Sequence, residues 1–74
     1  MSFGERMQQR RKELGLSIVD LAHKTKRCRQ TLHRYENGAI RNVPIDVIVL
    51  LARALDTTPN WLLGWDDKAG VAKR

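Results

Sequence analysis

The stretch that most limits the possible fold runs from Leu16 to Gly38, where two short amphipathic segments flank a basic connection. Ser17 and Asp20 stand three residues apart, close to the capping-box pattern that begins a helix. The second segment begins near Cys28 and stops at Gly38, which suits the left-handed conformation that closes helices. Two helices of about two turns each are too short to be stable alone. The rest of the chain must therefore pack against this pair.

The second helix of the pair has an apolar face and an opposite, polar face. Leu32 and Tyr35 set the inward direction at helical spacing. The outward side carries Arg29, Gln30, His33 and Arg34. In the DNA major groove, Arg makes paired hydrogen bonds to guanine and Gln makes them to adenine. The helix by itself fits a base-reading surface and an ordinary solvated face equally well.

Further positions extend this pattern along the chain, namely Leu16-Ser17, Leu21-Ala22, Thr31-Leu32, Arg34-Tyr35-Glu36-Asn37-Gly38 and Leu51-Ala52-x-x-Leu55. Together they resemble the helix-turn-helix of the lambda-repressor/Cro-type family, also called the xenobiotic-response-element family. The similarity covers about residues 3–64, nearly the whole chain. It implies an all-α fold, a compact five-helix lambda-repressor-like domain. In that fold the second helix crosses the DNA backbone and the third lies in the major groove.

Three positions depart from the family's pattern. Ile18 stands where the family usually has a Gln that contacts phosphate, which puts that contact in question. Lys26 replaces the usual turn glycine and predicts either a different turn conformation or strain. Arg27 takes the place of a small apolar residue, so we expect its stem to be buried with the charge reaching outward.

The pattern and the resemblance together nominate contact residues. For base readout we expect Arg29, Gln30 and Arg34, with His33 in second rank. For the DNA backbone we expect Ser17, Lys26, Arg27, Arg41 and Asn42. For Arg41, solvation without a contact stays open, because an exposed loop arginine is usually only solvated and its loop is one residue longer than the commonest form. The resemblance also pairs Arg11 with Glu36, which would tie the first helix to the recognition helix, although two solvated charges remain the alternative.

Three more helices complete the expected fold. The first spans residues 2–14 and begins with a capping-box pattern, and the fourth spans residues 44–55 with proline in its first turn. A single turn over residues 58–64 begins with a threonine cap. We assign residues 1–65 to one helix-turn-helix DNA-binding domain and residues 66–74 to a polar tail or linker.

The fourth helix has two apolar stripes. The first, expected to close the core, comprises Ile45, Ile48, Leu51, Ala52 and Leu55. The second comprises Val47, Leu50 and Ala54, and Trp65 follows the last turn. A neighbouring element would cover the second stripe, or it would form a dimer surface together with Trp65.

Charge favours a polyanion as the partner of one half of the chain. The net charge is +6, and residues 1–42 contain ten Lys or Arg against four Asp or Glu, whereas residues 43–74 contain four of each. The basic residues flank short helices instead of lining one long amphipathic helix, which favours nucleic acid over a membrane. A single cysteine excludes an internal disulfide, and the absence of a signal sequence predicts a cytoplasmic protein.

Other chemistry receives little support from the sequence. Cys28 lies between two arginines at a helix start, where a reactive thiol or a merely tolerated poor cap are both conceivable. His23, Cys28 and His33 lack a fourth metal ligand. No grouping typical of an active site is present, so we expect no enzyme activity, no metal and no cofactor.

The interpretation is a transcriptional regulator of the phage or prophage repressor type that binds a pseudo-palindromic operator in double-stranded DNA as a homodimer. The main alternative is an antitoxin whose primary partner is a toxin protein, bound through the second apolar stripe and Trp65. An RNA-binding module is disfavoured because stacked aromatic residues are lacking. A missing carboxyl-terminal domain could supply dimerisation or a further activity.

Overall fold

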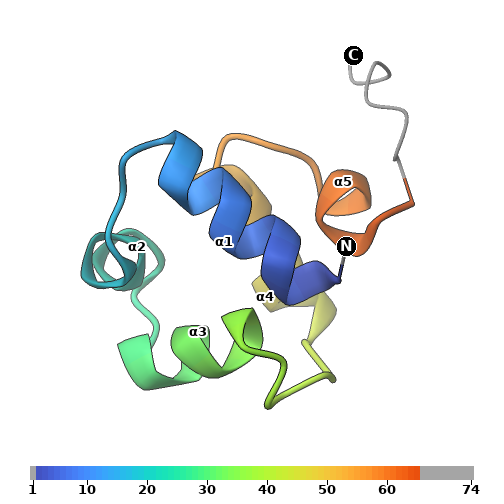
Figure 1. Cartoon of the computed structure of the whole chain (residues 1–74), viewed down its shortest axis with the longest axis horizontal. Coiled ribbons are helices and arrows are strands. Elements are labelled where there is room, and N and C mark those ends of the chain that lie inside the picture. Colours follow the sequence, from blue (N-terminus) through green and yellow to red (C-terminus); the bar gives the residue numbers. More distant parts are fainter. Residues whose placement is uncertain (1, 66–74) are drawn as a thin grey trace.

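Five helices follow one another along residues 2–65, the part of the chain that this computed structural model describes. They are α1 (Phe3–Glu13), α2 (Ile18–Thr25), α3 (Arg29–Glu36), α4 (Ile45–Ala54) and α5 (Pro59–Leu63). In Figure 1, α1 crosses the centre with α4 behind it, while α2, α3 and α5 surround it. The predicted all-α, five-helix fold is confirmed for this range. The predicted tail or linker, residues 66–74, lies outside the described residues.

Short-range capping signals fix the starts of three helices. Ser2 and Ser17 form complete capping boxes with Glu5 and Asp20, and each serine Oγ accepts a hydrogen bond from the amide of the acidic residue, at 3.2 and 3.0 Å. Thr58 Oγ1 accepts from the Trp61 amide at the start of α5, at 3.1 Å. These ends were predictable because each cap and its partner stand three residues apart.

The turn between α2 and α3 contains a residue in an unfavourable conformation. Lys26 has φ 57° and ψ 36°, the left-handed region in which glycine carries no steric penalty. The turn is thus left-handed without the usual glycine, and this conformation costs about 1–2 kcal/mol for an L side chain. The sequence left open a different turn conformation or strain at Lys26, and the structure shows the strained conformation.

One apolar core joins all five helices. Its fully buried side chains are Met7, Leu21, Leu32, Leu51, Leu55 and Leu62. The helix pairs in close contact are α1 with α3 and α5, α2 with α3 and α4, and α4 with α5. The two short helices therefore have the support that the sequence required of the rest of the chain.

One prediction about α4 was wrong, and one open alternative is decided. Ile45, expected in the core stripe, is 65% exposed because it is the first residue of α4. Val47, a member of the second stripe, is 6% exposed and belongs to the core cluster, so at this residue the stripe is covered within the chain. It borders a depression shared with Lys26 and Arg27, so the turn between α2 and α3 approaches this side of α4.

The amino end of α1 lies directly against the carboxyl end of α3. A Cβ atom placed on Gly4 would come within 2.3 Å of the Tyr35 carbonyl oxygen and within 2.5 Å of the Glu36 carbonyl oxygen. Both obstacles are backbone atoms, which cannot rotate away as a side chain can. Only glycine fits at this contact, and the position of α3 relative to α1 depends on it.

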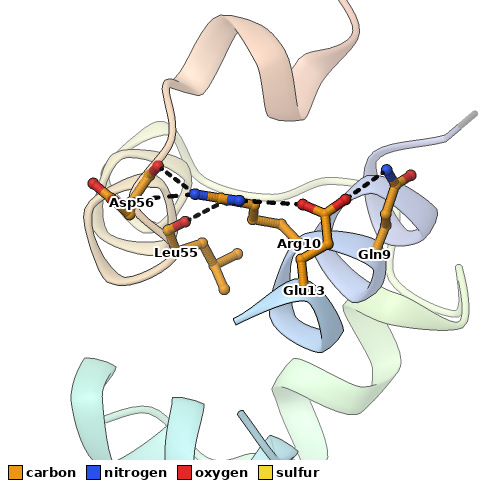
Figure 2. Close-up of polar contacts among 5 residues, drawn as sticks. All are labelled: Gln9, Arg10, Glu13, Leu55 and Asp56. Atoms are coloured by element: carbon orange, nitrogen blue, oxygen red, sulfur yellow. Dashed lines mark hydrogen bonds and ion pairs between the residues drawn. The ribbon is translucent and has the colours of Figure 1, made fainter. Parts of the chain in front are cut away.

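The opposite end of α1 holds the end of α4 through one arginine (Figure 2). Arg10 Nε donates to the Leu55 carbonyl oxygen at 2.9 Å, and Arg10 Nη2 donates to the Asp56 carbonyl oxygen at 3.1 Å. Arg10 Nη1 also donates to Glu13 Oε1 at 3.1 Å, and Gln9 donates to the other oxygen of that carboxylate. A cation at a helix carboxyl terminus satisfies carbonyls that have no partner inside the helix.

A second arginine of α1 packs against α5. Arg6 is 7% exposed, and its guanidinium carbon lies 5.2 Å from the centroid of the Trp61 ring. This distance suits a cation–π interaction. Trp61 also packs against the core cluster, which is the role predicted for it.

Candidate nucleic-acid interface

Four polar side chains share the exposed face of α3. Arg29, Gln30, His33 and Arg34 are exposed and border one shallow depression. Within residues 2–65, none of the four makes a hydrogen bond or an ion pair through its side chain. Their donors and acceptors are therefore available to an external partner. The structure brings together all four residues that the sequence nominated for base readout.

The buried face of α3 is anchored by apolar contacts and by one ion pair. Arg11 Nε lies 2.7 Å from Glu36 Oε2, and Arg11 Nη2 donates to Glu36 Oε1 at 3.1 Å. Arg11 Nη1 donates to the Leu16 carbonyl oxygen at 2.9 Å, at the entrance to α2. The Arg11 and Glu36 side chains are only 13% and 3% exposed, and the hydrogen bond to Glu36 raises the pKa of Arg11.

This two-point ion pair is the one that the resemblance implied, and it is present. Because both charges are largely removed from water and mutually satisfied, loss of either partner would leave the other buried without compensation. The pair therefore fixes α1, the carboxyl end of α3 and the start of the helix pair as one unit. Its contribution to an interface is to orient α3.

The turn between α2 and α3 adds positive charge beside this face. Lys26 and Arg27 are exposed, and together with Arg29 they border a further depression along α2. Arg27 is exposed as a whole residue, and the expected burial of its aliphatic stem stays a prediction. Thr25 is the buried residue of this turn, at 3% exposure, and its hydroxyl donates to the Leu21 carbonyl oxygen at 2.8 Å.

The remaining candidates for backbone contacts lie at two other places. Arg41 and Asn42 are exposed in the loop between α3 and α4, and Arg41 borders a depression at the junction of α1 and α3. Ser17 lies at the amino end of α2, where its backbone N–H donates to Asp20 Oδ2 at 2.9 Å. That hydrogen bond lowers the pKa of Asp20. The Ser17 hydroxyl accepts from Asp20 and keeps its own proton for a further acceptor.

The predicted dimer surface does not form one exposed stripe. Val47 is buried, Leu50 and Ala54 are half-buried, and Ala54 packs against the core. Trp65 is different, since it is 76% exposed directly after α5. Of the four residues nominated, only Trp65 is a largely exposed apolar side chain.

The residues considered for metal binding and for thiol chemistry do not form a site among the described residues. Among the described residues, no three His, Cys, Asp or Glu side chains gather as a metal site would require, so His23, Cys28 and His33 do not converge. Cys28 is exposed at the start of α3 and makes no capping hydrogen bond through its side chain. The nearby backbone amides of Thr31 and Gln30 lower the pKa of its thiol. No helix within residues 2–65 has the length and apolarity needed to span a membrane.

Three residues complete the depression on α3 without having been nominated for contact. They are Ile18, from the first turn of α2, and Asn37 and Ala39, which follow α3. Helical periodicity within α3 cannot reveal them, because each lies outside that helix. Their place depends on how α2 and the following loop fold against α3.

Two short helices joined by a left-handed turn, the second presenting a free polar face, define a helix-turn-helix domain. A helix-turn-helix family model matches residues 7–62, and the chain belongs to this family. The predicted lambda-repressor-like helix-turn-helix is thereby confirmed. The family consists of DNA-binding transcriptional regulators, and DNA binding in transcription regulation is the general function that membership gives this chain.

Solved structures of known regulators are similar to this chain in fold and in sequence. SinR, a master regulator of biofilm formation crystallised with DNA, is 30% identical, with a TM-score of 0.78 over 81% of this chain and 95% of that one. The restriction-modification controller protein C.AhdI from Aeromonas hydrophila is 38% identical, with a TM-score of 0.77 over 82% and 91%.

A third structure supports the fold alone. The P22 c2 repressor in complex with a synthetic operator is 24% identical, with a TM-score of 0.80 over 89% of this chain and 98% of that one. No curated protein sequence shows significant similarity to this chain.

Proposed function

We propose that this protein is a sequence-specific repressor of the phage or prophage type that inserts α3 into the major groove of double-stranded DNA. The observation that carries the proposal is the exposed face of α3, where Arg29, Gln30 and Arg34 have no side-chain partner within residues 2–65. Unpaired guanidinium and amide groups on a rigidly held helix are suited to base edges. The similarity to SinR, which was crystallised with DNA, supports the same partner.

Each of these side chains has a distinct role in this proposal. Arg29 and Arg34 donate to guanine O6 and N7, Gln30 pairs with adenine, and His33 contacts a base or a phosphate. Positive and polar groups around α3 contact phosphates and so fix the position of the helix along the DNA. These groups belong to Ser17, Lys26, Arg27, Arg41 and Asn42. The Asp20 carboxylate accepts from the Ser17 amide, so Ser17 meets a phosphate through its hydroxyl, and the turn supplies the main positive charge.

We further propose that two copies bind a pseudo-palindromic operator. A two-fold arrangement places both α3 helices in successive major grooves, with half-sites about 10 base pairs apart. Trp65, which is 76% exposed after α5, is the residue that we expect at the contact between the copies. The stripe on α4 contributes less to this contact than the sequence predicted, because Val47 is in the core.

The decisive experiment is selection of bound sequences from a random double-stranded DNA pool at two salt concentrations. We expect an inverted repeat with guanine and adenine at the centre of each half-site. Its affinity should fall steeply with salt. The slope of log affinity against log salt concentration should be about −1 for each phosphate contact. Salt-sensitive binding without any enriched sequence would contradict specific readout by α3.

The antitoxin alternative has weaker support. It requires the second apolar stripe to face a partner protein, and Val47 is buried within this chain. Purification of the protein from its native host in a stoichiometric complex with a small protein, with no enriched DNA site, would favour the antitoxin over the repressor.

A further inference from the structure

Ile18 is an apolar residue at the border of a polar surface. It is the first residue of α2, and it lines the same depression as Gln30 and Arg34 of α3. Its side chain is half-buried, with part packed against the core cluster and part open to this depression. Ala39, which follows α3 in the chain, is a second apolar member of the same border. The candidate reading face therefore contains an aliphatic surface beside the donors and acceptors.

An aliphatic group in this place selects for a particular kind of base. Isoleucine can neither donate nor accept a hydrogen bond, so contact with a phosphate or with a polar base edge would desolvate that group without compensation. In the major groove, thymine is the one standard base that presents an apolar group, its 5-methyl. Arg34 and Gln30 can hydrogen-bond to a polar base edge, and the aliphatic side chain beside them can contact the methyl group of a neighbouring thymine.

We propose that Ile18 is a specificity-determining residue that contacts the 5-methyl group of a thymine in each operator half-site. This proposal rests on the proposed function, because it requires α3 to lie in the major groove. It gives α2 a part in base recognition in addition to any phosphate contact at its amino end. Where the family usually has a Gln at this position, this chain exchanges a polar contact for an apolar one.

The test removes single methyl groups from the DNA. In the operator obtained by selection, each thymine is replaced in turn by deoxyuridine, which lacks only the 5-methyl, and affinity is measured by fluorescence anisotropy. We expect one position per half-site at which the wild-type protein binds about fourfold more weakly, the ratio that burial of one methyl group gives. Other thymines should tolerate the replacement.

Variants of the protein then assign that position. Ile18→Ala should bind the thymine and deoxyuridine operators equally at the sensitive position, whereas Ile18→Val should retain most of the discrimination. Val19→Ala is the matched control, because Val19 is the next residue of α2, is 39% exposed and borders a different depression. It should discriminate as the wild type does. Since Ile18 touches the core, Ile18→Gln, which carries the residue usual in the family, is a second variant for the case in which the Ala variant unfolds, and it should lose the discrimination.

Failure of this proposal is distinguishable from failure of the proposed function. An operator that tolerates deoxyuridine at every thymine, or discrimination that persists in Ile18→Ala, would overturn the role of Ile18 and leave the repressor proposal intact. A pool without any enriched sequence would overturn both.

Discussion

The arginines of α1 and those of α3 have the same chemistry and opposite surroundings. Arg10 and Arg11 of α1 donate to backbone carbonyls and a carboxylate of neighbouring segments, and both are partly buried. Arg29 and Arg34 of α3 are exposed and make no side-chain hydrogen bond or ion pair within residues 2–65. A basic composition is therefore divided between a scaffold and a contact surface, and only the second part is free to meet a polyanion.

The scaffold side of this comparison is most sensitive at Gly4. Gly4→Ala places a methyl group against two backbone carbonyls and must push α1 away from α3, so we expect a loss of at least about 3 kcal/mol in the free energy of unfolding. Urea denaturation measures this. Gly15→Ala is the control, because its Cβ meets open space and only the left-handed φ of 71° is unfavourable, for about 1 kcal/mol. Equal losses would show that the close approach is not limiting.

The next largest effect should follow from breaking the ion pair. Arg11→Ala leaves the Glu36 carboxylate buried without its partner, and we expect a loss of about 3 kcal/mol in unfolding free energy. The double variant Arg11→Met with Glu36→Leu removes both charges and should recover most of that loss. A single variant within about 0.5 kcal/mol of wild type would place this pair among solvated surface pairs.

On the contact surface of α3, a substitution should change DNA affinity and leave the stability of the fold unchanged. Arg34→Ala should weaken binding to the selected operator by about 1–3 kcal/mol and weaken binding to unrelated DNA much less. Its stability should stay within about 0.5 kcal/mol of wild type, because no described contact is lost. Arg53→Ala, at an exposed arginine of α4, serves as the control and should alter neither quantity. Equal losses on both DNAs would assign Arg34 to phosphate.

The smallest expected effect concerns Lys26, which influences both the stability of the fold and the contact with DNA. Lys26→Gly relieves the left-handed strain and should stabilise the fold by about 1 kcal/mol, while reducing the salt dependence of DNA binding by about one phosphate contact. Lys24→Gly, in the helical part of α2, is the matched control and should destabilise the fold by about 1 kcal/mol. A Lys26→Gly variant of unchanged stability would indicate that the turn carries no strain.

Features encoded within a few residues were predictable from the sequence. The capping boxes at Ser2 and Ser17 and the polar face of α3 follow from residues three or four apart, so local rules suffice. The Arg11–Glu36 pair spans 25 residues and was expected only because of the family resemblance. Its geometry depends on how α1 packs against α3, which no local pattern specifies.

Features created by packing between distant segments were missed or wrong. Nothing in the sequence around Gly4 reveals that two carbonyls of α3 lie against it. On α4, Ile45 is exposed although it was expected in the core, and Val47 is buried although both outcomes were open for it. A short apolar helix offers two stripes, and only its neighbours decide which one is buried. Ile18 was noted as a departure from the family, but its place beside the α3 side chains depends on the packing of α2.

The absence of internal bonds to the outer side chains of α3 also bears on how such a protein can change. Replacing Gln30 or Arg34 removes no described hydrogen bond and no core contact, so many residue types are compatible with the same backbone at these positions. New target sequences could therefore arise by single substitutions without passing through unfolded intermediates. The same property makes this helix face a practical starting point for libraries that redirect the protein to a chosen DNA site.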